Sequence, residues 1–279
     1  MEGTNAVVKD FQELDNKNVL SEEKYQETVD ALNDAYLYDS DTVLLVTVVI
    51  DCSQSVQEAG AFPVYNGFLK SFKSVIEQEP EACANIKLCV IRYGKDVEVV
   101  TGFTGMYDYH PDEEICYNMG TTDSAKALTK AFDLTEQEMY HQGKDLGKKL
   151  RGGLVFHITD GLPTSSQDEM MQMIKKYDEY SRSNGKRRIK IFSATPDMDV
   201  AKRLSSYSDQ TFLTEDYDGL TDAVKSVALL GSVYSSLPMK VDPVTGEMDI
   251  DLSQANAVEA EEGVVDIIPR TLMNVADMW

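Results

Sequence analysis

The chain has 279 residues, enough for one large domain or two small ones. Hydrophobic residues make up 42 % and charged residues 27 %, the balance of a globular protein, and the formal net charge is −22. A surface this acidic repels phosphate groups, so the composition argues against nucleic-acid binding and suits a cation or a basic partner.

Membrane insertion and a zinc site are also disfavoured. The longest apolar run, around residues 43–50, is too short to cross a bilayer, and the acidic N-terminus lacks a signal-peptide pattern. The four cysteines show no CxxC pair and no zinc spacing, and Cys52 and Cys89 lie in apolar runs where a cysteine acts as a small hydrophobe. We therefore expect a cytoplasmic protein with reduced cysteines.

The first elements in the chain are a helical extension and a central strand. Residues 1–40 carry apolar side chains at helical spacing, and Ser21 followed by two glutamates is typical of a helix start. The run TVLLVTVVI at 42–50 is β-branched and apolar on both faces. This pattern predicts a strand inside a parallel sheet, covered on both sides.

Strands and helices then alternate along residues 41–235, which we assign to one domain. Strands are predicted at 84–94, 96–103, 152–161, 187–195 and 210–215. Helices are predicted at 63–78, 122–140, 167–183, 199–207 and 218–234. The order predicts an α/β fold, with a doubly wound, mostly parallel, Rossmann-like sheet, one antiparallel edge strand and helices on both faces.

Polar side chains occur at the ends of two predicted strands and in one loop that leads into a helix. Asp51, Ser53 and Ser55 follow the first strand, Thr122 lies in the loop GTTDS, and Asp160 follows the strand ending in HITDG. Ligands of open α/β sheets bind at the carboxyl ends of the strands. Hydroxyl and carboxylate oxygens without imidazole or thiolate suit a hard divalent cation, with Mg²⁺ expected first and Mn²⁺ or Ca²⁺ as alternatives.

Three features follow one another in this chain: D-x-S-x-S, a threonine before a helix, and an aspartate after a central strand. This order resembles the von Willebrand factor A (VWA) domain and its metal-ion-dependent adhesion site (MIDAS). The resemblance covers roughly residues 42–232. It implies direct metal ligation by Ser53, Ser55 and Thr122, with Asp51 and Asp160 holding metal-bound waters or binding directly. Many members have glycine where this chain has Gln54, which would change the loop shape or shield the metal.

The segments PVYNGFLKSF, EQEPEACANIKLCVIRYG and SVYSS look most like bacterial TerY-type VWA proteins of tellurium-resistance and stress systems. This resemblance implies a cytoplasmic scaffold or assembly factor that captures a partner's Asp or Glu carboxylate through the metal, and not an enzyme. The alternative is a Mg²⁺-dependent phosphatase or hydrolase on a Rossmann-like sheet. That class needs D-x-D after the first strand, and this chain has Ser53 at the second position.

Residues 236–279 differ from the rest and are read as an acidic tail. Positions 238–279 hold nine acidic and two basic side chains, and the alternation in MDIDLS and VVDIIP predicts one or two short strands. One interpretation is a solvated terminus. The other is that a tail carboxylate, such as Glu261, Glu262 or Asp277, fills the metal site of its own chain or of a second copy, which would allow self-association. The loop Tyr107–His110 is expected near the metal face.

Overall fold

The structure is a computed structural model, and it describes residues 42–111, 115–181, 189–236, 239–241, 248–250 and 264–270. The chain divides into two compact units, Met1–Asp39 and Ser40–Trp279, and all described residues belong to the second. The predicted helical extension at 1–40 lies outside the described residues. So do Glu261, Glu262 and Asp277 of the predicted tail.

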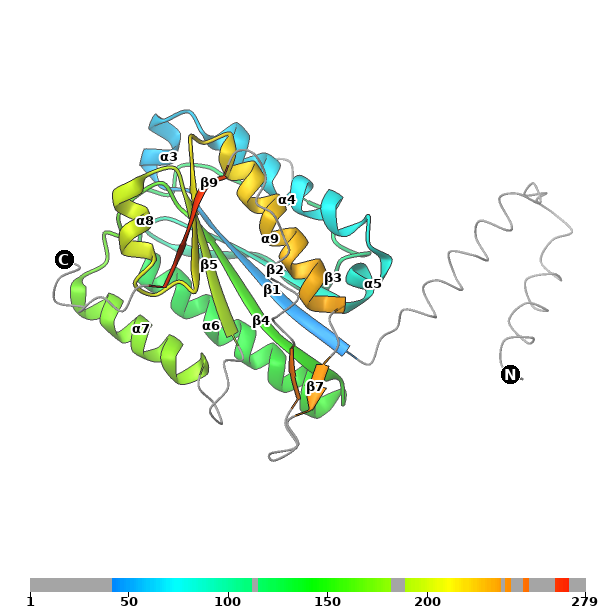
Figure 1. The fold of residues 1–279 in the computed structure, drawn as a ribbon. Helices are drawn as coiled ribbons and strands as arrows, with labels where there is room; N and C mark the ends of the chain where they lie inside the picture. Colours follow the sequence, from blue (N-terminus) through cyan, green and yellow to red (C-terminus); the bar gives the residue numbers. More distant parts are fainter. Residues whose placement is uncertain are drawn as a thin grey trace, which may run out of the picture. The chain divides into compact units, whose positions relative to one another are not determined.

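A seven-stranded sheet runs through the centre of the second unit, in the order β3-β2-β1-β4-β5-β6-β9 (Figure 1). The five inner strands are mutually parallel, and β3 and β9 pair antiparallel at the two edges. The strands of this sheet are β1 (Thr42–Asp51), β2 (Ile86–Tyr93), β3 (Val97–Gly105), β4 (Lys149–Ile158), β5 (Ile189–Thr195), β6 (Gln210–Thr214) and β9 (Val264–Pro269). A separate antiparallel pair joins β7 (Met239–Val241) to β8 (Met248–Ile250).

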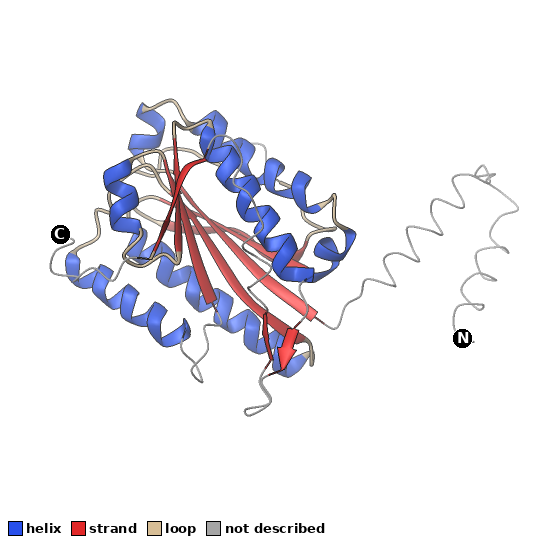
Figure 2. Ribbon diagram, viewed as in Figure 1, coloured by secondary structure: helices blue, strands red, loops and turns tan. Residues whose placement is uncertain are grey.

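Helices cover both faces of the sheet (Figure 2). They are α3 (Gln54–Glu58), α4 (Phe62–Ile76), α5 (Pro80–Asn85), α6 (Ser124–Tyr140), α7 (Gln167–Ser181), α8 (Met198–Leu204) and α9 (Gly219–Ser236), with a π-helical turn (His141–Asp145) after α6. Of these described helices, none is long and apolar enough to cross a bilayer.

The strand β1 separates two hydrophobic cores. Leu44 and Val46 pack in the core under α4, α5 and α9, whereas Val43 and Leu45 pack in the core under α6, α7 and α8. All four side chains are at most 3 % exposed. Burial of each such side chain contributes about 1.5–3 kcal/mol, so the apolar character of this run on both faces places it at the centre of the sheet.

The predicted α/β fold, doubly wound with helices on both faces, is confirmed, and each predicted strand and helix of residues 42–234 is present within a few positions of its expected ends. The expected antiparallel edge strand is β3. The prediction of one such strand was incomplete, because β9 forms a second one at the opposite edge. It comes from the VVDIIP segment of the predicted acidic tail, which was not expected to join the central sheet.

Helix α6 approaches β4 closely at Gly153. A Cβ atom added at Gly153 would lie 2.7 Å from Cγ2 of Thr135 and 3.3 Å from Cγ1 of Ile189. Thr135 cannot turn away freely, because its hydroxyl donates to the carbonyl of Ala131 at 2.8 Å and lies 2.9 Å from the hydroxyl of Thr47. The absence of a side chain at position 153 therefore sets the distance between helix and sheet.

We expect Gly153→Ala to lower the free energy of unfolding by about 2 kcal/mol, because the added methyl group overpacks this contact. The measurement is chemical denaturation at equilibrium. Gly102→Ala in β3 is the matched control, since a Cβ there meets no atom within 4 Å. Adding Thr135→Ser to Gly153→Ala removes the clashing methyl and should restore most of the loss. Equal effects of the two glycine substitutions would contradict this account of the packing.

Candidate metal site

Asp51 is the most deeply buried residue of the candidate site. It is the last residue of β1, between the parallel strands β2 and β4, and its side chain is fully buried. One carboxyl oxygen, Oδ1, accepts the backbone N–H of Ser53 at 2.9 Å. The other, Oδ2, accepts the hydroxyl of Thr159 at 2.6 Å. Both contacts hold the carboxyl group in one orientation at the carboxyl edge of the sheet.

A chain of hydrogen bonds connects the two serines to the second carboxylate. The hydroxyls of Ser53 and Ser55 are 3.0 Å apart, and Ser55 donates to Oδ1 of Asp160 at 2.9 Å. The phenol of Tyr217 donates to Oδ2 of Asp160 at 3.0 Å. Ser53 is 1 % exposed, whereas Ser55 is exposed and Asp160 is half-buried. The hydrogen-bonded groups thus extend from the buried Ser53 to the solvent-exposed Ser55 and the half-buried Asp160.

Thr122 joins this group from the loop before α6. A Cβ placed on Gly161 would lie 3.5 Å from Oγ of Ser55 and 3.7 Å from Oγ1 of Thr122, so both hydroxyls face the same small volume beside Gly161. Thr122 is 5 % exposed, whereas its neighbour Thr121 is exposed. Of the two threonines, Thr122 is therefore the one whose hydroxyl faces the same volume as Ser55, and its role as a metal ligand stays a prediction.

Backbone contacts fix the loop that carries Thr122. The N–H of Gln54 donates to the carbonyl of Gly120 at 2.7 Å, and the N–H of Met119 donates to the carbonyl of Cys52 at 2.9 Å. Gly120 has a φ of +83°, a left-handed conformation that favours glycine. This turn allows the chain to pair with the DCSQS segment and then enter α6.

The electrostatics of the site favour a cation. Burial raises the pKa of Asp51 from 3.8 to about 7, against the lowering effect of its hydrogen bonds to Thr159 and Ser53. Burial also raises the pKa of Asp160. Among nearby charges, Asp160 raises the pKa of Asp51, and Asp197 raises that of Asp160. Two carboxyls that repel each other, one fully and one partly buried, are stabilised when a positive charge binds between them.

The donor set fits a hard divalent cation. It offers carboxylate oxygens from Asp51 and Asp160 and hydroxyl oxygens from Ser53, Ser55 and Thr122, which are ligand types that Mg²⁺ and Ca²⁺ accept. The described residues contain no group of three or more His, Cys, Asp or Glu side chains that could hold a metal. The candidate site consequently depends on its hydroxyls.

Sequence reasoning missed Thr159 and Tyr217. Thr159 directly precedes the predicted Asp160, and Tyr217 follows β6, so both lie at the edge where ligands bind in such sheets. Position relative to a strand end was the only signal available for them. Their donation to Asp51 and Asp160 shows that they orient the carboxyl groups.

The expectation that the loop Tyr107–His110 lies near the metal face was wrong. Because β3 is antiparallel to β2, Gly105 at its end pairs with Lys87 at the start of β2. The loop therefore begins at the amino edge of the sheet, and the hydroxyl of Tyr107 donates to the carbonyl of Pro80 at the start of α5.

Gln54, where many VWA domains have glycine, is exposed. Its amide donates to the carboxylate of Glu58 at 2.5 Å, along helix α3. This contact, four residues along the chain, directs the side chain along the helix. The effect of Gln54 on metal affinity stays a prediction.

No protein-family model matches the chain, and a search of curated proteins found no similar sequence. Among solved structures, the pilus adhesin SpaC from Lactobacillus rhamnosus GG, in an open conformation, is 10 % identical over 68 % of this chain and 30 % of its own, with a TM-score of 0.52. The ArnB paralog VWA2 from Sulfolobus acidocaldarius is 16 % identical over 66 % of this chain and 45 % of its own, with a TM-score of 0.43. Proximal thread matrix protein 1 from the mussel byssus, with a zinc-occupied MIDAS motif, is 14 % identical over 73 % of this chain and 50 % of its own, with a TM-score of 0.45.

This chain thus spans half or less of the length of these three structures. At such low identities the likeness concerns the fold alone. The similarity to SpaC, with a TM-score of 0.52, indicates a similar fold.

The raised pKa of Asp51 predicts a pH-dependent stability of the metal-free protein. A carboxyl whose pKa is higher in the folded state takes up a proton more readily there than in the unfolded chain. The folded protein should therefore lose stability as pH rises from about 4 to about 7, and the loss from this group is roughly 4 kcal/mol.

Denaturation in the presence of a chelator at several pH values checks this expectation. Asp51→Asn removes the titrating group, so the stability of this variant relative to the native chain should increase as pH rises. Parallel curves for the two proteins would show that Asp51 ionises in the folded state as it does in the unfolded chain.

Proposed function

We propose that this chain is a metal-dependent protein-binding module of the VWA type, in which a divalent cation, Mg²⁺ in the first place, links the domain to a carboxylate of a partner protein. The observation that carries the proposal is the convergence of three hydroxyls and two carboxyls at the carboxyl edge of the sheet. The sequence motif that resembles a MIDAS supplies the same five residues. They are Asp51, Ser53, Ser55, Thr122 and Asp160.

Each residue has a role that follows from its position. Ser53, Ser55 and Thr122 present neutral oxygens, and Asp51 and Asp160 supply the negative charge. A bound cation would offer a Lewis-acidic position to an Asp or Glu side chain of a partner. Ser55 and Asp160 are the least buried members, so the partner approaches from their side.

The burial of Asp51 argues against the phosphatase alternative. A nucleophilic aspartate must reach the substrate, but Asp51 is fully buried and both of its oxygens accept hydrogen bonds. The position two residues later is Ser53, where that enzyme class needs a second carboxylate. A binding role without catalysis is therefore the better proposal.

The place of the protein in the cell is a further part of the proposal. The likeness of its sequence segments to TerY-type proteins supports a cytoplasmic scaffold or assembly factor in a stress or tellurium-resistance system. The acidic composition of residues 236–279 supports occupation of the site by a tail carboxylate of the same chain or of a second copy. In either case a carboxylate would bind the metal, as the carboxylate of an external partner would.

Calorimetric titration of the chelator-treated protein with Mg²⁺, Mn²⁺ and Ca²⁺ tests the metal site. We expect binding by the native chain and an affinity loss of about 10- to 100-fold or more in the double variant Ser53→Ala/Ser55→Ala, because two direct oxygens disappear. The matched control is Ser71→Ala/Ser74→Ala on helix α4, which should bind as the native chain does. Equal affinities of all three proteins for each cation would overturn the proposed site.

A further inference from the structure

Two cysteine sulfurs lie beside each other, and one of them belongs to Cys52, the residue between Asp51 and Ser53. The Sγ atoms of Cys52 and Cys116 are 2.9 Å apart, about 1 Å longer than an S–S bond of roughly 2.05 Å. Both cysteines are free thiols. Their positions are 64 residues apart in the chain, so the fold, and not local sequence, brings them together.

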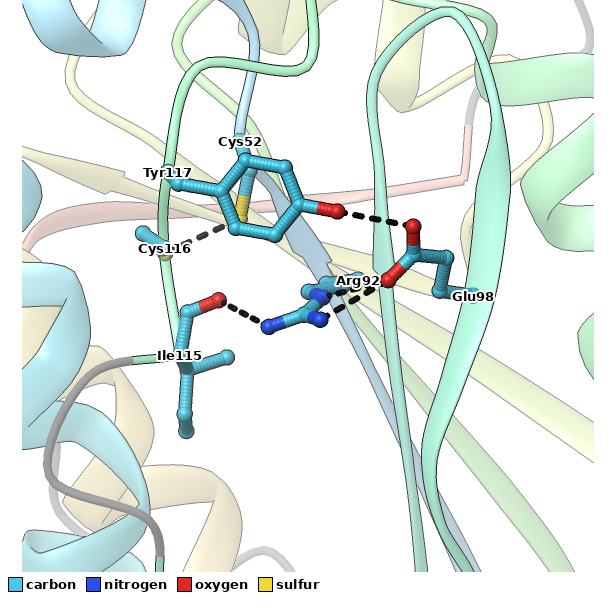
Figure 3. A network of polar contacts seen from close by, with 6 residues as sticks. All are labelled: Cys52, Arg92, Glu98, Ile115, Cys116 and Tyr117. Carbon is cyan, nitrogen blue, oxygen red and sulfur yellow. Dashed lines mark hydrogen bonds and ion pairs between the residues drawn. The ribbon is translucent and has the colours of Figure 1, made fainter.

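A network of polar contacts holds the chain on both sides of Cys116 (Figure 3). The guanidinium of Arg92 donates to the carbonyl of Ile115 at 2.9 Å and to the carboxylate of Glu98 at 2.8 and 3.0 Å. It also lies over the ring of Tyr117, 4.6 Å from the ring centroid, and Tyr117 donates to Glu98 at 2.7 Å. The residues before and after Cys116 are thus both fixed to the β2–β3 hairpin.

The backbone of both cysteines is fixed as well. The N–H groups of Ile115 and Cys116 donate to the side-chain oxygen of Asn66 on α4, at 2.9 and 2.8 Å. The N–H of Cys52 donates to the carbonyl of Tyr93 at 2.7 Å, and its carbonyl accepts from Met119. Two thiols held in this way have a high effective concentration toward each other, because little further ordering is needed for them to react.

We propose that Cys52 and Cys116 form a reversible disulfide, with a hydroperoxide as the oxidant. Cys116 is 9 % exposed and Cys52 is fully buried, so Cys116 reacts first. Its sulfur attacks one peroxide oxygen, the O–O bond breaks, and a sulfenic acid and one water (or alcohol) form. The sulfur of Cys52 then attacks the sulfenic sulfur, the S–O bond breaks, and a second water leaves. The two thiols lose two electrons in total, and a dithiol reductant reverses the reaction.

The bond would connect two segments that carry the candidate metal ligands. Cys52 lies between Asp51 and Ser53, and Cys116 lies in the segment that leads to Thr122 and α6. A disulfide would hold this loop against the DCSQS segment. This consequence rests on the proposed metal-binding function. We expect tighter metal binding in the oxidised protein, because a covalent bond would hold the loop and the DCSQS segment together even when the hydrogen bonds between them open.

The test compares the 279-residue chain, fully reduced and after treatment with hydrogen peroxide, both in chelator. Alkylation of the denatured protein should count four thiols before oxidation and two afterwards, and peptide mapping should find Cys52 joined to Cys116. The melting temperature should rise on the order of 5–10 °C on oxidation, since the bond closes a long loop, and a dithiol reductant should return it.

Cys116→Ser should abolish both the cross-link and the rise in melting temperature, whereas Cys83→Ala should keep both. Cys52→Ala provides a second variant in case one substitution impairs folding. Four unreacted thiols after peroxide treatment, a cross-link between other cysteines, or irreversible oxidation of Cys116 alone would each overturn the proposal.

Titration of the two redox forms with Mg²⁺ separates the disulfide from its effect on the site. We expect an affinity higher by about tenfold in the oxidised form. Equal affinities would overturn the coupling and leave the disulfide established by the thiol count. Absence of binding in both forms would overturn the metal-binding proposal itself, while the cross-link would still be judged by peptide mapping.

Discussion

Asp51 is held out of water at the end of the central strand, and both of its carboxyl oxygens accept hydrogen bonds from the protein. The sheet creates this situation. Apolar side chains on both faces of β1 require cover by helices on both sides, and the same cover removes solvent from the residue at which the strand ends. A carboxyl group in such a place is costly when ionised, and its burial accounts for most of the rise in its pKa.

The neighbourhood of Asp51 relieves this cost only in part, through the hydrogen bonds from Thr159 and Ser53. Asp160 adds a second carboxyl group, and the contacts around both are hydroxyls and an N–H group that orient the oxygens without neutralising the charge. Folded proteins commonly pair buried charges. Acidic groups in this arrangement destabilise the fold when no cation is bound. Residues that lower the stability of a fold are expected at binding sites, where function and not stability determines the sequence.

Much of the fold was predictable because its signals are local. The run TVLLVTVVI and the alternation of strands and helices indicate the layers, and the polar residues after strands indicate the edge where a ligand binds. Thr159, Tyr217 and the pair Cys52–Cys116 were not predictable, because each acts through a partner far away in the chain. The loop after β3 lies at the edge opposite to the predicted one, because β3 runs antiparallel to β2 and ends beside the first residues of β2.

The strand β9 has a consequence for the order in which the sheet can be completed. Its partner β6 ends at Thr214, but β9 spans Val264–Pro269, with α9 in between. During synthesis the outer hydrogen-bonding groups of β6 therefore stay without their native partner until residues 264–269 have left the ribosome. An open strand edge can pair with other chains, so the nascent protein passes through an aggregation-prone stage until β9 pairs with β6.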